Sequence, residues 1–122
     1  MKIRLISFLK RNITIKQIDL DEDHNSTITK FVFNYYNVDI DLLHSKSRKR
    51  SLVQSRHMIC YLAYIFNDED NKIVHPLKEF LKKDRTTILH SIKTMSNLIE
   101  TNKTIANDYL ILYNKIKMEI YD

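Results

Sequence analysis

The stretch from Lys82 to Ile92, KKDRTTILHSI, combines three basic residues, one aspartate, two threonines and a histidine within 11 residues. A threonine presents a hydroxyl and a methyl group, so it can bond to a base edge and touch a thymine methyl. An arginine can donate to guanine or to a phosphate, and lysines beside it suit phosphate oxygens. These residue types indicate recognition of a nucleic acid through hydrogen bonds and charge.

Helical periodicity explains how these polar groups can share one surface. The spacing predicts a helix from Arg85 to about Glu100, with Asp84 as its N-cap. The apolar stripe consists of Ile88, Leu89, Ile92, Met95 and Ile99. At about 100° per residue the opposite face is centred between Thr87 and His90. That face also includes Thr86, Thr94 and, at its edge, Lys93. The helical angle directs Arg85 toward the core side, so its reach depends on its place at the helix end.

The preceding residues complete a helix-turn-helix pattern. Pro76 is suited to a first helical turn and opens a short helix at PLKEFL, which a KKD turn separates from the next helix. In such a motif the second helix places its N-terminal side chains in the DNA major groove. Lys82 and Lys83 stand where they can contact phosphates. However, threonines cover many exposed helix faces, so this pattern alone leaves DNA binding open.

Charge supplies a second observation. The net charge is +5, and no acidic residue lies between Asp41 and Asp68. The basic residues of that stretch are Lys46, Arg48, Lys49, Arg50 and Arg56. The remaining 15 basic and 15 acidic residues cancel, so the whole excess lies there. Most of it belongs to SKSRKRS, residues 45–51, which we call the basic loop. Such a run is either a solvated face or a polyanion contact.

The rest of the chain predicts a single all-α domain, a compact bundle of five or six helices. Further helices are expected over residues 27–36, capped by Ser26 or Thr27, over 51–66, and over 104–120. Residues 26–122 form the predicted domain. Residues 1–25 are an N-terminal extension of uncertain structure, whose DLDEDHNS segment is interpreted as a linker.

Several classes of function are excluded or disfavoured. The chain has no glycine, which rules out a glycine-rich phosphate loop. Its longest apolar run, MICYLAYIF, is shorter than the ~20 residues that span a bilayer, and no signal peptide is evident, so a cytoplasmic location is expected. Cys60 is interpreted as a core residue. Neither the five histidines nor the DED cluster shows metal-ligand spacing, so we expect no catalysis, cofactor or metal.

The run ITKFVFNYYNVDIDLLHSKSRKRSLVQSRHMICYLAYIF, followed by PLKEFLKKDRTTILHSI, resembles the C-terminal DNA-binding domain of the bacterial replication initiator DnaA. The matching features are a YY-x-V-x-x-x-LL start, a basic loop ending in R-S-[LV], and a D-x-T-T-[IV]-L-H start of the recognition helix. The resemblance covers about Ile28 to Lys117. It implies the all-α, Trp-repressor-like fold of that domain, without the initiator's ATPase domain.

The resemblance also implies roles for individual residues. Arg48 would reach into the minor groove, with Lys49, Arg50 and Arg56 near phosphates. Base contacts would fall on Asp84, Arg85, Thr86, Thr87 and His90, and Lys46 and Lys93 complete the predicted DNA-binding set. The family pattern has His where Arg85 stands and Gly-Arg where Lys82 and Lys83 stand. We therefore expect affinity for DNA to be retained and sequence preference to change.

The sequence thus predicts a sequence-specific binder of double-stranded DNA, which serves as a replication-related or transcriptional regulator or as an accessory protein of a chromosome or mobile element. No nucleotide or membrane is expected as a partner. The alternative is a protein-interaction module that binds an acidic partner or an initiator protein. RNA is disfavoured because the Tyr and Phe residues fall mostly on buried stripes rather than exposed stacking surfaces. The target site, the oligomeric state and the role of residues 1–25 stay open.

Overall fold

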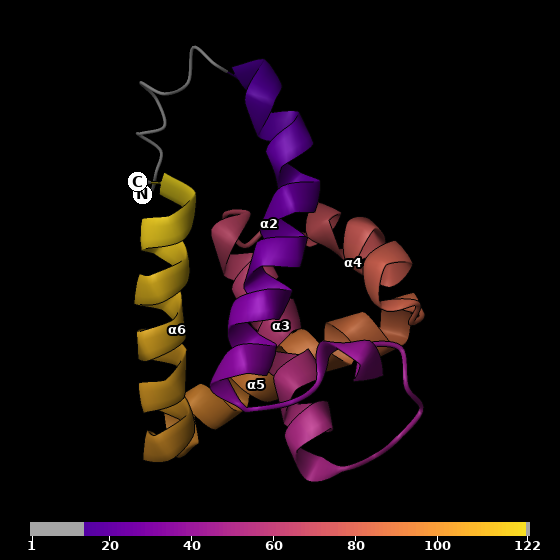
Figure 1. Cartoon of the computed structure of the whole chain (residues 1–122), viewed down its shortest axis with the longest axis vertical. Coiled ribbons are helices and arrows are strands. Elements are labelled where there is room, and N and C mark those ends of the chain that lie inside the picture. Colours follow the sequence, from indigo (N-terminus) through magenta and orange to yellow (C-terminus); the bar gives the residue numbers. More distant parts are fainter. Residues whose placement is uncertain (1–13, 122) are drawn as a thin grey trace.

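The computed structural model describes residues 14–121, with side chains from His24 onward, and every regular element in that part is helical (Figure 1). The elements are α2 (Thr14–Tyr35), η1 (Ile40–Leu42), α3 (Arg50–Phe66), η2 (Asn71–Ile73), α4 (Val74–Leu81), α5 (Arg85–Thr101) and α6 (Lys103–Tyr121). The predicted all-α fold is confirmed. No helix of the described part has both the length and the apolar character needed to cross a membrane.

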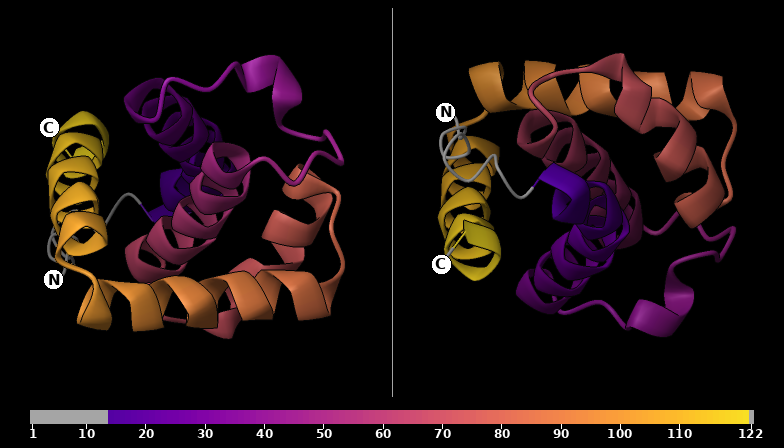
Figure 2. Two further views of the ribbon diagram at one scale, coloured as in Figure 1. Left: turned by 90° about the horizontal axis from the view of Figure 1, so that it is seen from below. Right: turned by 90° about the horizontal axis from the view of Figure 1, so that it is seen from above.

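Helix α3 is the central element of the bundle. It packs against α2 on one side and α5 on the other, and α6 closes the fold against α2 and α5 (Figure 2). Its buried side is formed mainly by Leu52, Met58, Ile59, Leu62 and Ala63. Cys60 is fully buried there, as predicted, and burial raises the pKa of its thiol to about 12. The thiol therefore stays protonated at neutral pH and serves in packing.

The helices of the C-terminal half begin and end close to the predicted residues. Helix α5 begins at Arg85, α3 and α6 begin one residue earlier than expected, and α4 begins at Val74. Pro76 consequently occupies the third position of α4. It is tolerated because the first four N–H groups of a helix have no intrahelical acceptor.

The N-terminal prediction was wrong in one respect. The DLDEDHNS segment is not a linker, because α2 runs from Thr14 to Tyr35 without interruption. Ser26 and Thr27 therefore lie inside the helix and do not cap it. Within this stretch Asn25 and Thr29 are buried, and the Thr29 hydroxyl donates to the Asn25 carbonyl at 2.8 Å. Packing has overridden the weak local preference of these polar residues for helix caps and turns. Residues 1–13 of the expected extension lie outside the described residues.

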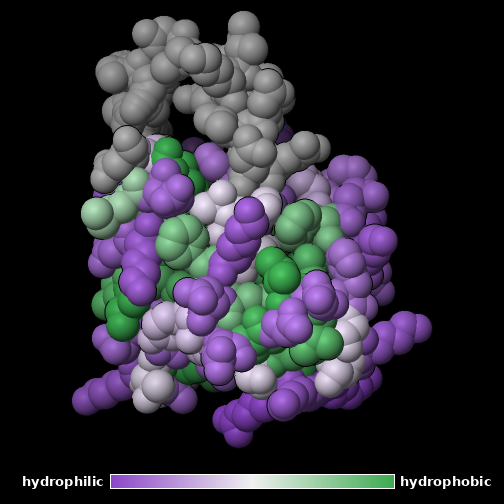
Figure 3. Space-filling view, in the orientation of Figure 1, coloured by the Kyte–Doolittle hydropathy of each residue, from purple (hydrophilic) through white to green (hydrophobic). Residues whose placement is uncertain are grey.

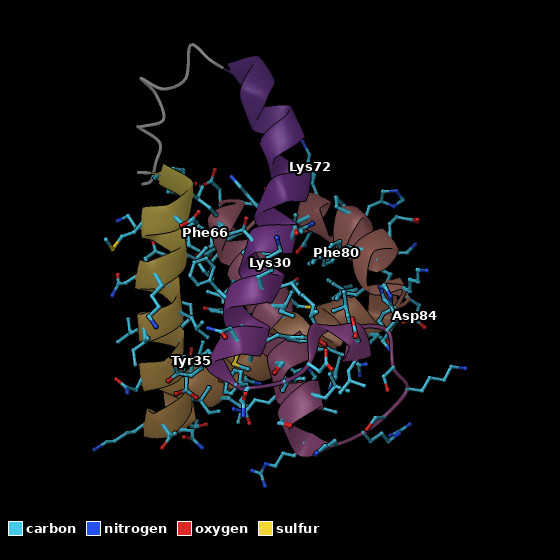
Figure 4. All side chains as sticks on the ribbon, in the orientation of Figure 1. Lys30, Tyr35, Phe66, Lys72, Phe80 and Asp84 are labelled. Carbon is cyan, nitrogen blue, oxygen red and sulfur yellow. The ribbon has the colours of Figure 1, made fainter. Side chains whose placement is uncertain are left out.

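A polar contact joins the C-terminal end of α2 to the N-terminal part of α6. The carboxylate of Asp108, on α6, accepts hydrogen bonds from the hydroxyls of Tyr35 at 2.6 Å and Tyr36 at 3.0 Å. Figure 4 shows Tyr35 at the end of α2 beside α6. The bond to Asp108 raises the pKa of Tyr35, and burial raises that of Tyr36. Both phenols are thereby held in the donor form.

Candidate nucleic-acid interface

The turn between α4 and α5 is built by two residues with distinct local geometry. Lys82 ends α4 in the left-handed conformation, with φ 57° and ψ 48°. Asp84 has extended backbone, and its carboxylate accepts a hydrogen bond from the Thr87 N–H at 2.8 Å. The predicted N-cap is thus confirmed, and the bonds to Thr87 lower the pKa of Asp84. An ionised Asp84 fixes where α5 begins and which way its first turn points.

Helix α5 has one buried and one open face, as its periodicity predicts. The side chains of Ile88, Ile92 and Met95 are buried against the core. The exposed side chains of its first turns are Arg85, Thr86, Thr87, His90 and Lys93. Arg85 is exposed even though the helical angle directs it toward the core side, because it is the first residue of the helix. Lys82 is exposed and Lys83 is half-buried in the turn beside them.

A second row of side chains lies behind His90. The His90 imidazole lies 3.3 Å from the Thr94 hydroxyl, and its ring centroid is 6.2 Å from that of His57 in an edge-to-face arrangement. His57, on α3, in turn lies 3.0 Å from the Ser91 hydroxyl. Burial and the proximity of His90 lower the pKa of His57. His57 is therefore neutral at pH 7, and its ring packs edge to face against that of His90.

The basic loop presents its charges outward. Lys46, Arg48, Lys49 and Arg50 are all exposed, and Arg50 is already the first residue of α3. Two serines shape the loop, because the Ser45 hydroxyl accepts from the Ser47 N–H at 3.0 Å and the Ser47 hydroxyl accepts from the Lys49 N–H at 3.2 Å. These side chain to backbone bonds restrict the loop without involving any of its cations.

Arg56 differs from the other predicted cations. It is half-buried, and burial lowers the pKa of its guanidinium. Its guanidinium donates to the main-chain carbonyls of Leu42, Leu43, Ser45 and Ser47. The resemblance placed this residue near phosphates, whereas the structure directs it at the backbone of the basic loop and of Leu42 and Leu43, at the end of η1.

The basic loop lies beside the helix-turn-helix. His44 Nε2 lies 2.8 Å from the Phe80 carbonyl near the end of α4, and it must donate because a carbonyl only accepts. In both views of Figure 2 the chain between η1 and α3 passes close to the turn that leads into α5. Figure 3 shows hydrophilic side chains along the lower and right margins of this face, where Figure 1 shows these segments. The two predicted contact segments thus lie next to each other.

Sequence reasoning missed His44, Ser45, Ser47 and His57 as contributors to this surface. Ser45, Ser47 and His44 bond to main-chain atoms, which leave no pattern of residue types in a sequence. His57 was detectable, because it follows Arg56 on the helix whose start carries the basic loop. Among residues 24–121, no group of three or more His, Cys, Asp or Glu side chains is placed to hold a metal ion.

Comparisons with known proteins agree with this architecture. A family model described as the bacterial DnaA protein helix-turn-helix matches residues 25–95. The chromosomal replication initiator protein DnaA of Bacteroides thetaiotaomicron is 33% identical over 104 residues, which cover 73% of this chain and 22% of that protein. The same protein of Rickettsia bellii is 30% identical, covering 80% of this chain and 24% of its own length.

The chain thus spans about a fifth to a quarter of the length of these curated relatives. No solved structure gives a significant match. The family match includes α3, α4, the turn and most of α5, which are the segments that form the surface described above. This homology supports binding of double-stranded DNA. The chain belongs to the bacterial DnaA helix-turn-helix family.

Proposed function

We propose that this chain binds double-stranded DNA with a preference for particular sequences. The first turns of α5 enter the major groove, and the basic loop lies over the adjacent minor groove and its phosphates. The proposal rests above all on the exposed row of Arg85, Thr86, Thr87 and His90, set on a helix whose other face is buried. A rigid helix with short polar groups on its open face can approach base edges closely.

Base contacts and phosphate contacts fall on different residues in this arrangement. Thr86, Thr87 and His90 read bases, together with Arg85 and the outer side of Asp84. Phosphates are contacted by Lys46, Lys49, Arg50, Lys82, Lys83 and Lys93, and Arg48 enters the minor groove. Phosphate contacts supply affinity that falls with salt, whereas base contacts supply sequence preference. We infer that the chain serves DNA replication or the regulation of a chromosome or mobile element. It acts in the cytoplasm.

The test is a fluorescence-anisotropy titration of a random duplex and of an AT-rich duplex that carries a DnaA-type box, at low and moderate salt. Wild type is expected to prefer the box. Thr87→Ala should reduce that preference by about 1 to 3 kcal/mol. Thr101→Ala is the matched control, because Thr101 is an exposed threonine at the far end of the same helix. It should leave the preference unchanged.

The alternative outcomes are distinct. Equal, salt-sensitive binding to both duplexes would show phosphate contacts without base reading, and would overturn the sequence-specific part of the proposal. Absence of binding to either duplex at low salt, where phosphate contacts are strongest, would overturn the proposal entirely. The basic surface would then be assigned to an acidic protein partner.

A further inference from the structure

The guanidinium of Arg56 occupies the inner side of the basic loop. Its Nε donates to the Leu43 carbonyl at 3.3 Å, and Nη1 donates to the Ser47 carbonyl at 3.5 Å. Its Nη2 lies within bonding distance of the carbonyls of Leu42, Leu43 and Ser45. All three nitrogens of one side chain therefore face main-chain oxygens on both sides of His44. Few donors are left to point toward a ligand.

We propose that Arg56 is a positioning residue, which shapes the basic loop for DNA through main-chain carbonyls instead of contacting a phosphate itself. The inference rests on the proposed DNA binding of the same surface. Arginine suits the role because its planar fork of five N–H groups can reach several carbonyls at once, whereas a lysine ammonium is a single point of charge. By drawing the backbone inward, Arg56 leaves the cations at 46, 48, 49 and 50 on the outside, where they are exposed.

The two roles predict opposite behaviour for Arg56→Lys. If Arg56 contacts a phosphate, a lysine keeps the charge and most of the affinity, and Arg56→Gln lowers the slope of log K against log salt by about 0.9. If Arg56 positions the loop, Arg56→Lys loses roughly tenfold in affinity, as does Arg56→Gln, because both lose the fork. In an Arg48→Ala background the same Arg56→Lys change should then cost less affinity than it does in the wild-type background, since one of the contacts that Arg56 orients is already absent.

Limited trypsin digestion of the free protein supplies a measurement that needs no DNA. Trypsin cuts after the cations of the basic loop, so a loosened loop is cleaved faster. Arg56→Gln adds no cleavage site and should be cut in the loop several-fold faster than wild type. Lys115→Gln, an equal loss of charge on an exposed residue of α6, should be cut there at the wild-type rate. Helical circular dichroism confirms that each variant is folded before it is compared.

Each outcome decides a separate point. Loop cleavage that is unchanged in Arg56→Gln would overturn the inference, as would wild-type affinity in Arg56→Lys. Absence of DNA binding by the wild-type protein would overturn the proposed function and the DNA part of this inference. Faster loop cleavage in that case would still show that Arg56 holds the loop.

Discussion

His44 and Phe80 are 36 residues apart in the chain, and His44 Nε2 donates to the Phe80 carbonyl at 2.8 Å. This bond joins the segment before the basic loop to the last turn of α4. The two parts of the candidate interface are therefore held at a set distance before any ligand arrives. Such preorganisation reduces the ordering cost of binding.

Loss of this bond should weaken both folding and binding. His44→Ala removes the donor and is expected to lower the free energy of unfolding by about 1 kcal/mol, the net value of a typical hydrogen bond. Urea unfolding measures this loss, and anisotropy should show weaker binding of DNA. His75→Ala, at an exposed position of α4, is the control. An equal effect of the two substitutions would show that the bond contributes nothing specific.

Lys82 offers a substitution that should stabilise the fold. A left-handed backbone costs a residue other than glycine about 1–2 kcal/mol, and Lys82 adopts it at the end of α4. The resemblance to DnaA places glycine at this position. Lys82→Gly should raise the free energy of unfolding by about 0.5–1 kcal/mol, after the greater entropy of unfolded glycine is subtracted. It should also weaken DNA binding, because one cation is lost.

Lys83→Gly is the matched control for that measurement. Among the described residues other than Lys82, only Asn37, Asp68 and Glu69 have positive φ, so Lys83 gains no relief of strain from glycine. This variant should be less stable than wild type in urea. A gain of stability at Lys83 equal to that at Lys82 would contradict the explanation.

His57 should make stability depend on pH. Burial and the neighbouring His90 lower the pKa of His57 below its ordinary value of 6.5. The unfolded chain therefore binds more protons between that lowered pKa and about 6.5, so the contribution of neutral His57 is complete above this range and is lost as pH falls through it. The urea concentration at the unfolding midpoint of the wild-type protein should decrease as the pH is lowered from about 7.5 to about 5. It should decrease less for His57→Gln, which keeps a polar group beside Ser91. Equal slopes for the two proteins would exclude His57 as the source.

Asp108 should contribute to stability without affecting binding. Asp108→Ala removes the acceptor of two tyrosine hydroxyls, and a hydrogen bond to a charged group contributes about 1.5–3 kcal/mol. We expect a loss of about 2–3 kcal/mol in urea unfolding and no change in DNA affinity. With Tyr35 and Tyr36 both replaced by Phe, the same Asp108→Ala change should cost much less. If the losses of stability from the substitutions simply add, the hydrogen bonds of the two hydroxyls are not the reason for the effect of Asp108→Ala.

Substitution of Arg85 should change which DNA sequence the protein prefers. The family pattern has histidine at this first position of α5, and Arg85 is exposed there. Arg85→His should therefore raise the preference for a DnaA-type box over a random duplex by about tenfold, within the 1–3 kcal/mol of one base contact. The ratio of the two dissociation constants measures it. An unchanged ratio would mean that Arg85 contacts only the backbone of the DNA.

Local signals in the sequence predicted the parts of the fold that local chemistry determines. The stripe of Ile88, Ile92 and Met95 and the cap at Asp84 defined α5 and its exposed face. The same kind of reasoning failed at Ser26 and Thr27, because residues typical of a helix start can also lie inside a helix that packing extends. The roles of His44 and Arg56 were missed because their partners are carbonyl oxygens of distant residues, which any residue type supplies.

The use of carbonyl oxygens as bonding partners affects how this surface can change by substitution. Arg56 bonds to main-chain oxygens, and the loop's own side-chain bonds come from Ser45 and Ser47, so the conformation of the basic loop does not depend on its four cationic side chains. Substitutions at Lys46, Arg48, Lys49 or Arg50 can therefore accumulate without the loop losing its shape. The protein can adjust its affinity for its ligand in small steps, and the same four positions are the natural sites for a combinatorial library aimed at tuning that affinity.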